Sequence, residues 1–434
     1  MKMTDYYLPD SPTDSVPFAC RAGDFVFLAG GIAAHPKTGV PLELKALLGY
    51  PYHWSNINKQ IDYIYTQMSS VLAEAGSSME QIMKVNTYHT NPQDIYEALR
   101  LRKDYFGTET PPPSTLVLVP ELPVREACVT TDIIALASDA ILGREAACTS
   151  TAQAPMPPHQ RIWGNRIYIK AAKGGGFIFT SGRTNNVIGA PTDDKSVGKE
   201  DFPYFYDKPR VATEIILDYL KSVLEEEGAS FADVVKAEIH VKNMSDIAGL
   251  DEVWQKAFPK DPPARVFVPV TFPNEYAIFE IELIAVDPKG PYKKEIVFSS
   301  AAPKPLGHES QAVKAGYLLF FSSQLATDYK NGVAPEARTD INFPFHSSHV
   351  KKQVRYILTN IDSICKEAGT SKDHLVRRRA IHENLNELGQ AESVWREVLG
   401  NRLPPTTTFR TAGPLLVPGC MVQYDLIAFL PGEE

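Results

Sequence analysis

A threefold internal repeat is the feature that most constrains the fold of this 434-residue chain. Three segments share a helical pattern that ends in a glycine, and a basic residue follows each glycine eight positions later. The residue after a Pro-rich stretch then lies 38, 37 and 37 positions beyond the glycine. Constant spacing in three copies predicts one structural unit repeated in tandem. The glycines are Gly76, Gly228 and Gly369, the basic residues are Lys84, Lys236 and Arg377, and the residues after the Pro-rich stretches are Ser114, Arg265 and Thr406.

Each copy has the pattern of a strand, an irregular loop, a long amphipathic helix, a second strand, a shorter helix and a hairpin. The glycine after the long helix fits a position where left-handed backbone is cheap only without a Cβ. The hairpin is clearest in Pro262–Val286, where two β-branched and aromatic stretches flank a Pro/Asn turn. One helix layer over a mixed sheet predicts an α+β domain. In copy one the apolar stripe of the long helix is Ile61, Ile64, Met68, Val71 and Leu72.

Domain boundaries follow from polar, Pro-rich stretches between the copies. The long loops His35–Ser55 and Asn185–Lys208 lie between the first strand and the long helix of their copies, and are candidates for lids or for contacts between copies. The predicted organisation is a tail at 1–15, copy one at 16–138, a linker at 139–159, copy two at 160–287, a linker at 288–295 and copy three at 296–434.

Composition excludes several classes of function. The net charge of −8 and the pI near 5.8 argue against a general nucleic-acid binder, which needs basic surface. No apolar run has the length of a membrane span, and the first ten residues do not resemble a signal peptide, so we expect a cytoplasmic protein without membrane contact. Five scattered cysteines form no CxxC pair and ten histidines form no HExxH motif, so no metal site is expected.

Copy two resembles the RidA/YjgF family of reactive-intermediate deaminases through FTSGR (Phe179–Arg183), the helix and strand of Glu225–Asp246, and the segments PPARVFV and IFEIELIAV. Copies one and three are similar mainly through the helix-glycine landmark and the final strand, so the resemblance spans nearly the whole chain. It implies a chorismate-mutase-like α+β fold, and trimers with sheets inside, helices outside and clefts between units. Three copies in one chain suggest an intrachain pseudo-trimer, while homo-oligomers of the whole chain stay an open alternative.

The resemblance also implies an active site. The family's arginine after Pro-Ala, which holds the substrate carboxylate through two charged hydrogen bonds, falls on Arg265. The acidic residue that positions the attacking water falls on Glu280, and the tyrosine ahead of the first strand falls on Tyr168. Ser181 and Gly182 line the same cleft. Imine hydrolysis needs a held carboxylate, a positioned water and a path for protons, and requires no metal or organic cofactor.

This sequence departs from the family pattern at two positions of copy two and more widely elsewhere. Phe267 replaces a frequent cysteine, and Asp251 replaces an asparagine on the second helix, so a substrate other than a small 2-iminopropanoate-like compound is indicated. Because copies one and three lack the arginine and the glutamate, the sequence predicts one working site, in copy two. Their residues at the arginine, glutamate and tyrosine positions are Ser114, Thr130 and Val16 in copy one, and Thr406, Gln423 and Glu309 in copy three.

Structural interpretations compete with the functional ones. Arg265 and Glu280 on two strands of one hairpin would form an ordinary cross-strand ion pair, worth roughly 0.2–1 kcal/mol. The register of the other motif residues favours a ligand site. The remaining polar candidates have structural interpretations: Glu282 as a neutralised or exposed carboxylate, His89, His240 and His382 as partly buried histidines with backbone partners, Arg377–Arg379 as a solvated rim, and Trp254 and Trp395 as core.

The function predicted first is cofactor-free hydrolysis of a carboxylate-bearing imine or enamine at one inter-domain site centred on Arg265. A specialised pathway enzyme that hydrolyses or rearranges a larger aromatic or ring-derived enamine is the second hypothesis, favoured by Phe267. A non-catalytic metabolite-binding or holdase-like module is the third. All three expect a small-molecule partner with a carboxylate and no nucleic acid.

Overall fold

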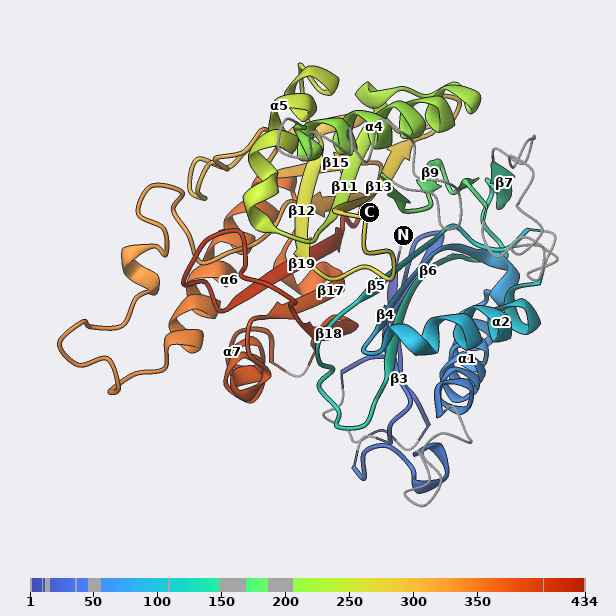
Figure 1. Ribbon diagram of the computed structural model, residues 1–434, viewed down its shortest axis with the longest axis horizontal. Coiled ribbons are helices and arrows are strands. Elements are labelled where there is room, and N and C mark those ends of the chain that lie inside the picture. Colours follow the sequence, from blue (N-terminus) through green and yellow to red (C-terminus); the bar gives the residue numbers. More distant parts are fainter. Residues whose placement is uncertain are drawn as a thin grey trace.

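The computed structural model describes residues 2–9, 11, 16–35, 37–45, 56–107, 110–147, 169–185, 206–400 and 402–432. These residues form three mixed sheets, each with a pair of helices, which confirms the predicted α+β class of three tandem chorismate-mutase-like domains. The helix pairs lie on the outside of the molecule, with the sheets between them (Figure 1). Tyr168 falls outside the described residues. So do most of the residues in the two long loops that were candidates for lids or for contacts between copies.

The first copy forms a sheet in the order β1-β2-β3-β6-β4-β5. The long helix α1 and the shorter helix α2 each precede a strand at the β4-β5 edge, as the repeat pattern predicts. The elements are β1 (Met3–Tyr6), β2 (Ala19–Ala22), β3 (Phe25–Ile32), α1 (Asn56–Glu74), β4 (Ile82–His89), α2 (Ile95–Phe106), β5 (Ser114–Leu118) and β6 (Val129–Leu136).

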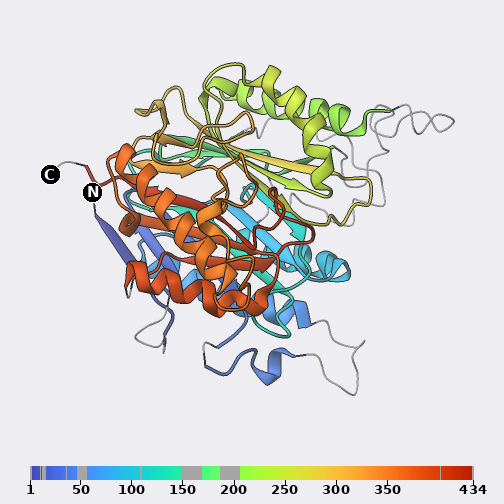
Figure 2. The ribbon, with the colours of Figure 1, turned by 90° about the vertical axis from the view of Figure 1, so that its left-hand side faces the viewer.

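The other two copies repeat this order as β7-β8-β9-β13-β11-β12 and β14-β15-β16-β19-β17-β18, with β10 added beside β13. In the view turned by 90°, the helices of the third copy lie side by side over their sheet (Figure 2). The elements of copy two are β7 (Glu145–Ala147), β8 (Ala171–Gly174), β9 (Phe177–Thr180), β10 (Arg183–Thr184), α4 (Lys208–Glu226), β11 (Val234–Val241), α5 (Ile247–Ala257), β12 (Ala264–Pro269) and β13 (Phe279–Val286). Those of copy three are β14 (Lys294–Val297), β15 (Ala312–Ala315), β16 (Leu318–Phe321), α6 (His349–Ala368), β17 (Leu375–His382), α7 (Leu388–Leu399), β18 (Thr406–Arg410) and β19 (Val422–Phe429).

The hairpin predicted for Pro262–Val286 is wrong. Strands β12 and β13 both form, but β11 lies between them, paired in parallel with β12 and antiparallel with β13. Copies one and three show the same arrangement, with β4 between β5 and β6 and β17 between β18 and β19. Because strand pairing is non-local, the short turn in the sequence does not reveal that an earlier strand separates the two.

The stretches predicted as a tail and as linkers are more than connections. Each supplies the edge strand of the sheet that follows it in the chain: β1 pairs with β2, β7 with β8, and β14 with β15. The strand β1 also contacts copy three, because Arg402 Nε lies 2.8 Å from a carboxylate oxygen of Asp5. These short strands lack the alternating apolar pattern that identifies a buried strand, so sequence periodicity missed them.

The long helices end as predicted, and their apolar stripes cover the sheets. Gly76, Gly228 and Gly369 have φ values of 76°, 79° and 80°, a left-handed conformation that other residues adopt at a cost. In copy one, Ile61, Ile64 and the other residues of the predicted stripe are all buried. Trp254 and Trp395 are fully buried as well, as expected for core residues.

A second apolar core lies where the three sheets meet, and each copy contributes aromatic rings to it. The ring of Phe177 contacts Phe25 at a centroid distance of 5.7 Å and Phe320 at 5.9 Å. The sheet faces opposite the helices are therefore buried too, so neither face of the central strands is exposed to solvent. The charged residues of those strands must consequently pair with one another inside the molecule.

Candidate active site

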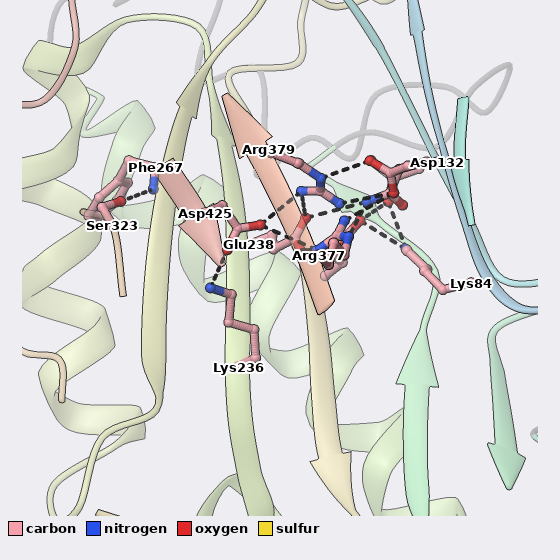
Figure 3. Close-up of polar contacts among 12 residues, drawn as sticks. Lys84, Asp132, Lys236, Glu238, Phe267, Ser323, Arg377, Arg379 and Asp425 are labelled. Carbon is pink, nitrogen blue, oxygen red and sulfur yellow. Dashed lines mark hydrogen bonds and ion pairs between the residues drawn. The ribbon is translucent and has the colours of Figure 1, made fainter. Parts of the chain in front are cut away.

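Ion pairs link the three copies in a cycle at the centre of the molecule (Figure 3). Lys84 of copy one pairs with Glu282 of copy two at 2.9 Å, and Lys236 of copy two pairs with Asp425 of copy three at 2.6 Å. Arg377 of copy three completes the cycle with an oxygen of Asp132 of copy one, 3.0 Å away. The basic residue that marks each repeat therefore contacts the acid on the last strand of the next copy.

A second set of residues, two positions further along the central strands, lies beside this cycle. They are Asn86, Glu238 and Arg379, and Arg379 pairs with Glu238 and, at 2.9 Å, with Asp132. The amide of Asn86 donates to Glu282 at 3.1 Å. Across both sets, four cations face four carboxylates, so the buried charge is balanced. Asn86, Glu238 and Arg379 occupy the same position in the three copies. Three identical subunits could not provide an amide, a carboxylate and a guanidinium at that position.

The solvated rim predicted for Arg377–Arg379 is therefore wrong. All three arginines are buried, Arg377 and Arg379 in the central network and Arg378 on the helix side of β17. Alternation along the strand separates their faces as expected. The prediction failed because neither face of β17 reaches solvent.

Residues expected to share one site lie in different contacts between copies. Arg265 on β12 and Glu280 on β13 are two strands apart, roughly 9.6 Å, and are also offset along β11, because Arg265 pairs with Ala237 and Glu280 with His240. The odd offset between Ala237 and His240 puts the two side chains on opposite faces of the sheet. Neither a shared site nor the alternative cross-strand ion pair is formed.

Arg265 lies in the contact between copies two and three, where two carboxylates already hold it. Its Nη1 is 2.5 Å from Asp251 on α5, and its Nε is 3.0 Å from Glu309 of copy three. The side chain is 1% exposed, and a Cβ on Gly307 would overlap its Nη2. Burial raises the pKa of Glu309, although Arg265 opposes the shift. The group of three carries one positive and two negative charges when ionised.

The copy-three side of this two–three contact keeps the serine of the family motif and replaces its acid with an amide. Ser322 Oγ accepts from the backbone N of Arg265 at 2.8 Å, and Gln423 donates to the carbonyl of Phe267 at 2.7 Å. The ring of Phe267 packs under the guanidinium of Arg265, 4.6 Å from its Cζ. A small hollow of about 20 Å³, partly open to solvent, adjoins Ser322 and Tyr329 on the copy-three side.

Ser181, Gly182 and Glu280 face copy one instead. The backbone N of Ser114 donates to Ser181 Oγ at 2.9 Å, and Gly182 N donates to the carbonyl of Ser114 at 3.0 Å. A Cβ on Gly182 would overlap Glu280 Oε1 and Thr115 Oγ1, so both oxygens lie against this glycine. The motif residues of copy two thus meet the position where copy one has a serine in place of the arginine.

The electrostatics of this one–two contact separate two carboxyls on one strand. Burial and the charge of Glu282 raise the pKa of Glu280 to about 8, and Lys84 only partly opposes this. Burial alone would raise the pKa of Glu282 too, but Lys84 and Arg379 outweigh it and lower its pKa to about 2. Glu282 is therefore an ionised carboxylate whose charge is balanced by Lys84 and Arg379, in agreement with the prediction. Glu280, by contrast, is mainly protonated at neutral pH.

The contact between copies three and one has neither the arginine nor the glutamate of the family. Thr407 Oγ1 accepts from Gly30 N at 2.9 Å, and Thr130 takes the position of the acid. A cation is nevertheless present, because Arg378 donates to Thr406 Oγ1 at 2.9 Å and pairs with Glu392 at 2.7 Å. The sequence did not single out Arg378, since it lies on the strand beside the family position.

Two other polar predictions need correction. The rings of His89 and His382 are fully buried and make no hydrogen bond among the described residues, so the expected backbone partner is missing. Burial, together with Arg102 for His89 and Arg378 for His382, lowers their pKa values to about 3 and about 4, which keeps both rings neutral. Sequence analysis also missed Arg102 on α2, whose Nη1 donates to Ser114 Oγ at 2.8 Å.

No group of three or more potential metal ligands occurs among the residues described. In that same part of the chain, none of the helices has the length and apolar character needed to cross a membrane.

Comparisons with known proteins identify each copy separately. The model of the family described as endoribonuclease L-PSP matches residues 10–137, 160–287 and 299–429. A RutC family protein of Pyrococcus horikoshii is 32% identical over 136 residues, which are 31% of this chain and 98% of that protein. A RutC family protein of Pyrococcus abyssi is 31% identical over 136 residues, 31% of this chain and 97% of that protein. A crystal structure of a Rid-family protein from Yersinia pestis, 25% identical, covers 32% of this chain and 99% of its own, with a TM-score of 0.27.

Proposed function

The chain belongs to the endoribonuclease L-PSP family, to which the RidA/YjgF proteins also belong, and from this we propose that it hydrolyses carboxylate-bearing imines or enamines in the contact between copies one and two. The observation that carries the proposal is the position of Glu280. It lies against Gly182 in the one–two contact, buried and mainly protonated near neutral pH. A carboxyl whose pKa lies near the working pH can both give and take a proton, as a general acid–base must.

The reaction follows from that single group. Glu280 donates its proton to the imine nitrogen while the C=N electron pair moves onto nitrogen, and the carboxylate that remains orients a water. The water oxygen bonds to the imine carbon and its proton passes to Glu280. Glu280 then protonates the nitrogen of the carbinolamine, the C–N bond breaks as the hydroxyl oxygen forms the C=O bond, the hydroxyl proton returns to Glu280, and ammonia and a carbonyl product leave. The hydroxyl and backbone of Ser181 and Gly182 form the wall of this contact.

The two–three contact is the less suitable site for this chemistry. Gln423 takes the place of the acid, and an amide does not exchange a proton near neutral pH. Arg265 is held by Asp251 and Glu309, so a substrate carboxylate would have to displace one of them from a group that already carries excess negative charge. We assign Arg265 the role of a clamp between copies two and three. The argument from Phe267 for a bulky substrate applies to that contact, whereas Leu116 lies at the matching position of the one–two contact.

Two variants separate these assignments. Glu280→Gln keeps the shape and the hydrogen-bonding capacity of the protonated carboxyl, and we expect it to lower kcat by roughly 100-fold or more on an imino acid generated in situ. Arg265→Lys keeps a positive charge but loses the planar fork, and turnover should stay within a few-fold of the original. Full activity in Glu280→Gln would refute the proposal, and a large loss confined to Arg265→Lys would move the site to the two–three contact. A screen of small 2-imino acids against bulky carboxylated enamines identifies the substrate size.

A further inference from the structure

Copy one has a polar cluster between its sheet and its helices, where a domain normally has an apolar core. Thr87 and His89 project from β4 and Thr131 pairs with Thr87 from β6, while Tyr65 comes from α1 and Arg102 from α2. All five side chains are buried, and Arg102 is 3% exposed. The charge of Arg102 acts to lower the pKa of His89 on β4 and of Tyr65 on α1, so the three side chains belong to one electrostatic cluster.

Copy two provides an internal comparison, because the repeat aligns it with copy one without gaps as far as Arg102. Counting from Gly76 and Gly228 gives four of the counterparts. The matching strand pairs Thr87–Thr131 and Ile239–Ile281 give the fifth. Every one of the five positions is apolar and buried there. In copy three two of the five positions are polar, His382 and Tyr424, so Tyr65, Thr87 and Arg102 are the positions that are polar in copy one alone. The counterparts of Tyr65, Thr87, His89, Arg102 and Thr131 in copy two are Leu217, Ile239, Val241, Trp254 and Ile281.

Arg102 is the charge in this cluster, and among the described residues no carboxylate pairs with it. The other four buried arginines of the described chain each pair with at least one acid, whereas Arg102 bonds to Ser114 Oγ and lies over the ring of Phe106. Within the same part of the chain, its Nε and Nη2 have no hydrogen-bond partner. These two nitrogens lie on the same edge of the guanidinium, the edge that holds a carboxylate through two parallel hydrogen bonds. Leaving such a buried charge unpaired costs several kcal/mol.

The other side chains of this cluster are suited to an anion. As far as the described residues go, the hydroxyls of Tyr65, Thr87 and Thr131 and both nitrogens of His89 have no hydrogen-bond partner with normal geometry. A hydroxyl can donate a hydrogen bond, and so can one nitrogen of a neutral imidazole. Together these side chains offer one fixed positive charge and several donors away from solvent.

We propose that copy one binds a small carboxylate, of the size of formate or acetate, between its sheet and its helices on the Nε–Nη2 edge of Arg102. The site is distinct from the Glu280 carboxyl, but Ser114 connects the two: its Oγ binds Arg102 and its backbone N binds Ser181 in the one–two contact. Occupation of the Arg102 site therefore fixes one wall of that contact. The site is a place where a small carboxylate regulates the contact rather than the place of reaction.

Binding of acetate, measured by calorimetry and by the shift in melting temperature, tests the proposal without any turnover. Arg102→Met removes the fork but keeps an unbranched side chain, and Arg100→Met removes an exposed arginine from the same helix as a matched control. We expect the original protein and Arg100→Met to bind acetate saturably, and Arg102→Met to bind at least about tenfold more weakly. Without acetate, Arg102→Met should be no less stable than the original, because it removes an unpaired buried charge.

Two further variants and two competing anions separate the possible outcomes. Tyr65→Phe deletes one donor and should weaken acetate binding several-fold, so it replaces Arg102→Met if that variant does not fold. Glu280→Gln should bind acetate normally, which separates this site from the proposed reaction. Absence of saturable binding, unchanged binding in Arg102→Met, or binding of chloride or inorganic phosphate in preference to acetate would each overturn the proposal.

Discussion

Replacing Glu280 by glutamine should change how the stability of the protein depends on pH. The folded pKa is raised from 4.5 to about 8, so the folded state holds a proton that the unfolded chain has already lost over that interval. The stabilising contribution of this group is fully present below pH 4.5 and is lost as pH rises towards 8. With 8 − 4.5 = 3.5 pH units and about 1.4 kcal/mol per unit, the loss amounts to about 5 kcal/mol. Glutamine cannot ionise, so Glu280→Gln should not show it.

Urea unfolding followed by tryptophan fluorescence at intervals from pH 5 to pH 8.5 measures this effect as a difference between the two proteins. We expect Glu280→Gln to gain on the original protein by about 1.4 kcal/mol for every pH unit from pH 5 to about pH 7, and by less as the pH approaches and passes 8. Parallel curves would show that Glu280 is ionised in the folded state and would refute the reasoning for its role as an acid.

A control on the same strand has the opposite sign. The pKa of Glu282 is lowered to about 2, so its contribution is present above pH 4.5 and is lost only as pH falls towards 2. Glu282→Gln should therefore destabilise the protein from pH 5 upwards. The deficit should shrink only towards the upper end of the range, because loss of the Glu282 charge lowers the pKa of Glu280. The same slope in both variants would indicate a general response to strand substitution.

Three more predictions concern stability. Arg379→Met removes one of the two guanidinium groups that pair with Asp132 and Glu238, which leaves an excess buried negative charge, and should lower the unfolding free energy by roughly 3–5 kcal/mol. Arg355→Met, which breaks an exposed pair, should cost about 0–1 kcal/mol in the same urea assay. Gly182→Ala should lower the melting temperature and perturb turnover, because its Cβ overlaps two oxygens, while Gly389→Ala in an open part of α7 should stabilise by up to about 1 kcal/mol. Glu309→Gln should weaken the Arg265 clamp by roughly 1–3 kcal/mol, and an unchanged urea midpoint would show that the clamp has no structural role.

Spacing in the sequence was sufficient to predict the three domains. The glycines that end the long helices and the basic residue that follows them are local signals, since each depends on the backbone of its own segment. The pairing of β12 and β13 is not local, because it depends on where β11 enters the sheet. That distinction explains why the elements were predicted correctly and their hairpin was not.

The sequence predicted residues for the candidate site but not that they lie in two different contacts between copies. Arg265 and Glu280 belong to one copy, yet each works with residues of a different neighbour, and a single-copy motif contains no information about that division. Arg102 was missed for a related reason, since it lies on a helix at the position of a tryptophan in the other two copies. An alignment of the copies by structural position, with buried polar substitutions marked, would have revealed it.

The central ion-pair network requires three different copies, each with a fixed neighbour on either side. A homotrimer of copy two alone would bring three Glu238 carboxylates together without a guanidinium, and one of copy three would bring together three Arg379 side chains. Neither copy two nor copy three could therefore balance its buried charge in a homotrimer. Each copy needs its two different neighbours, so the three domains are stable only together.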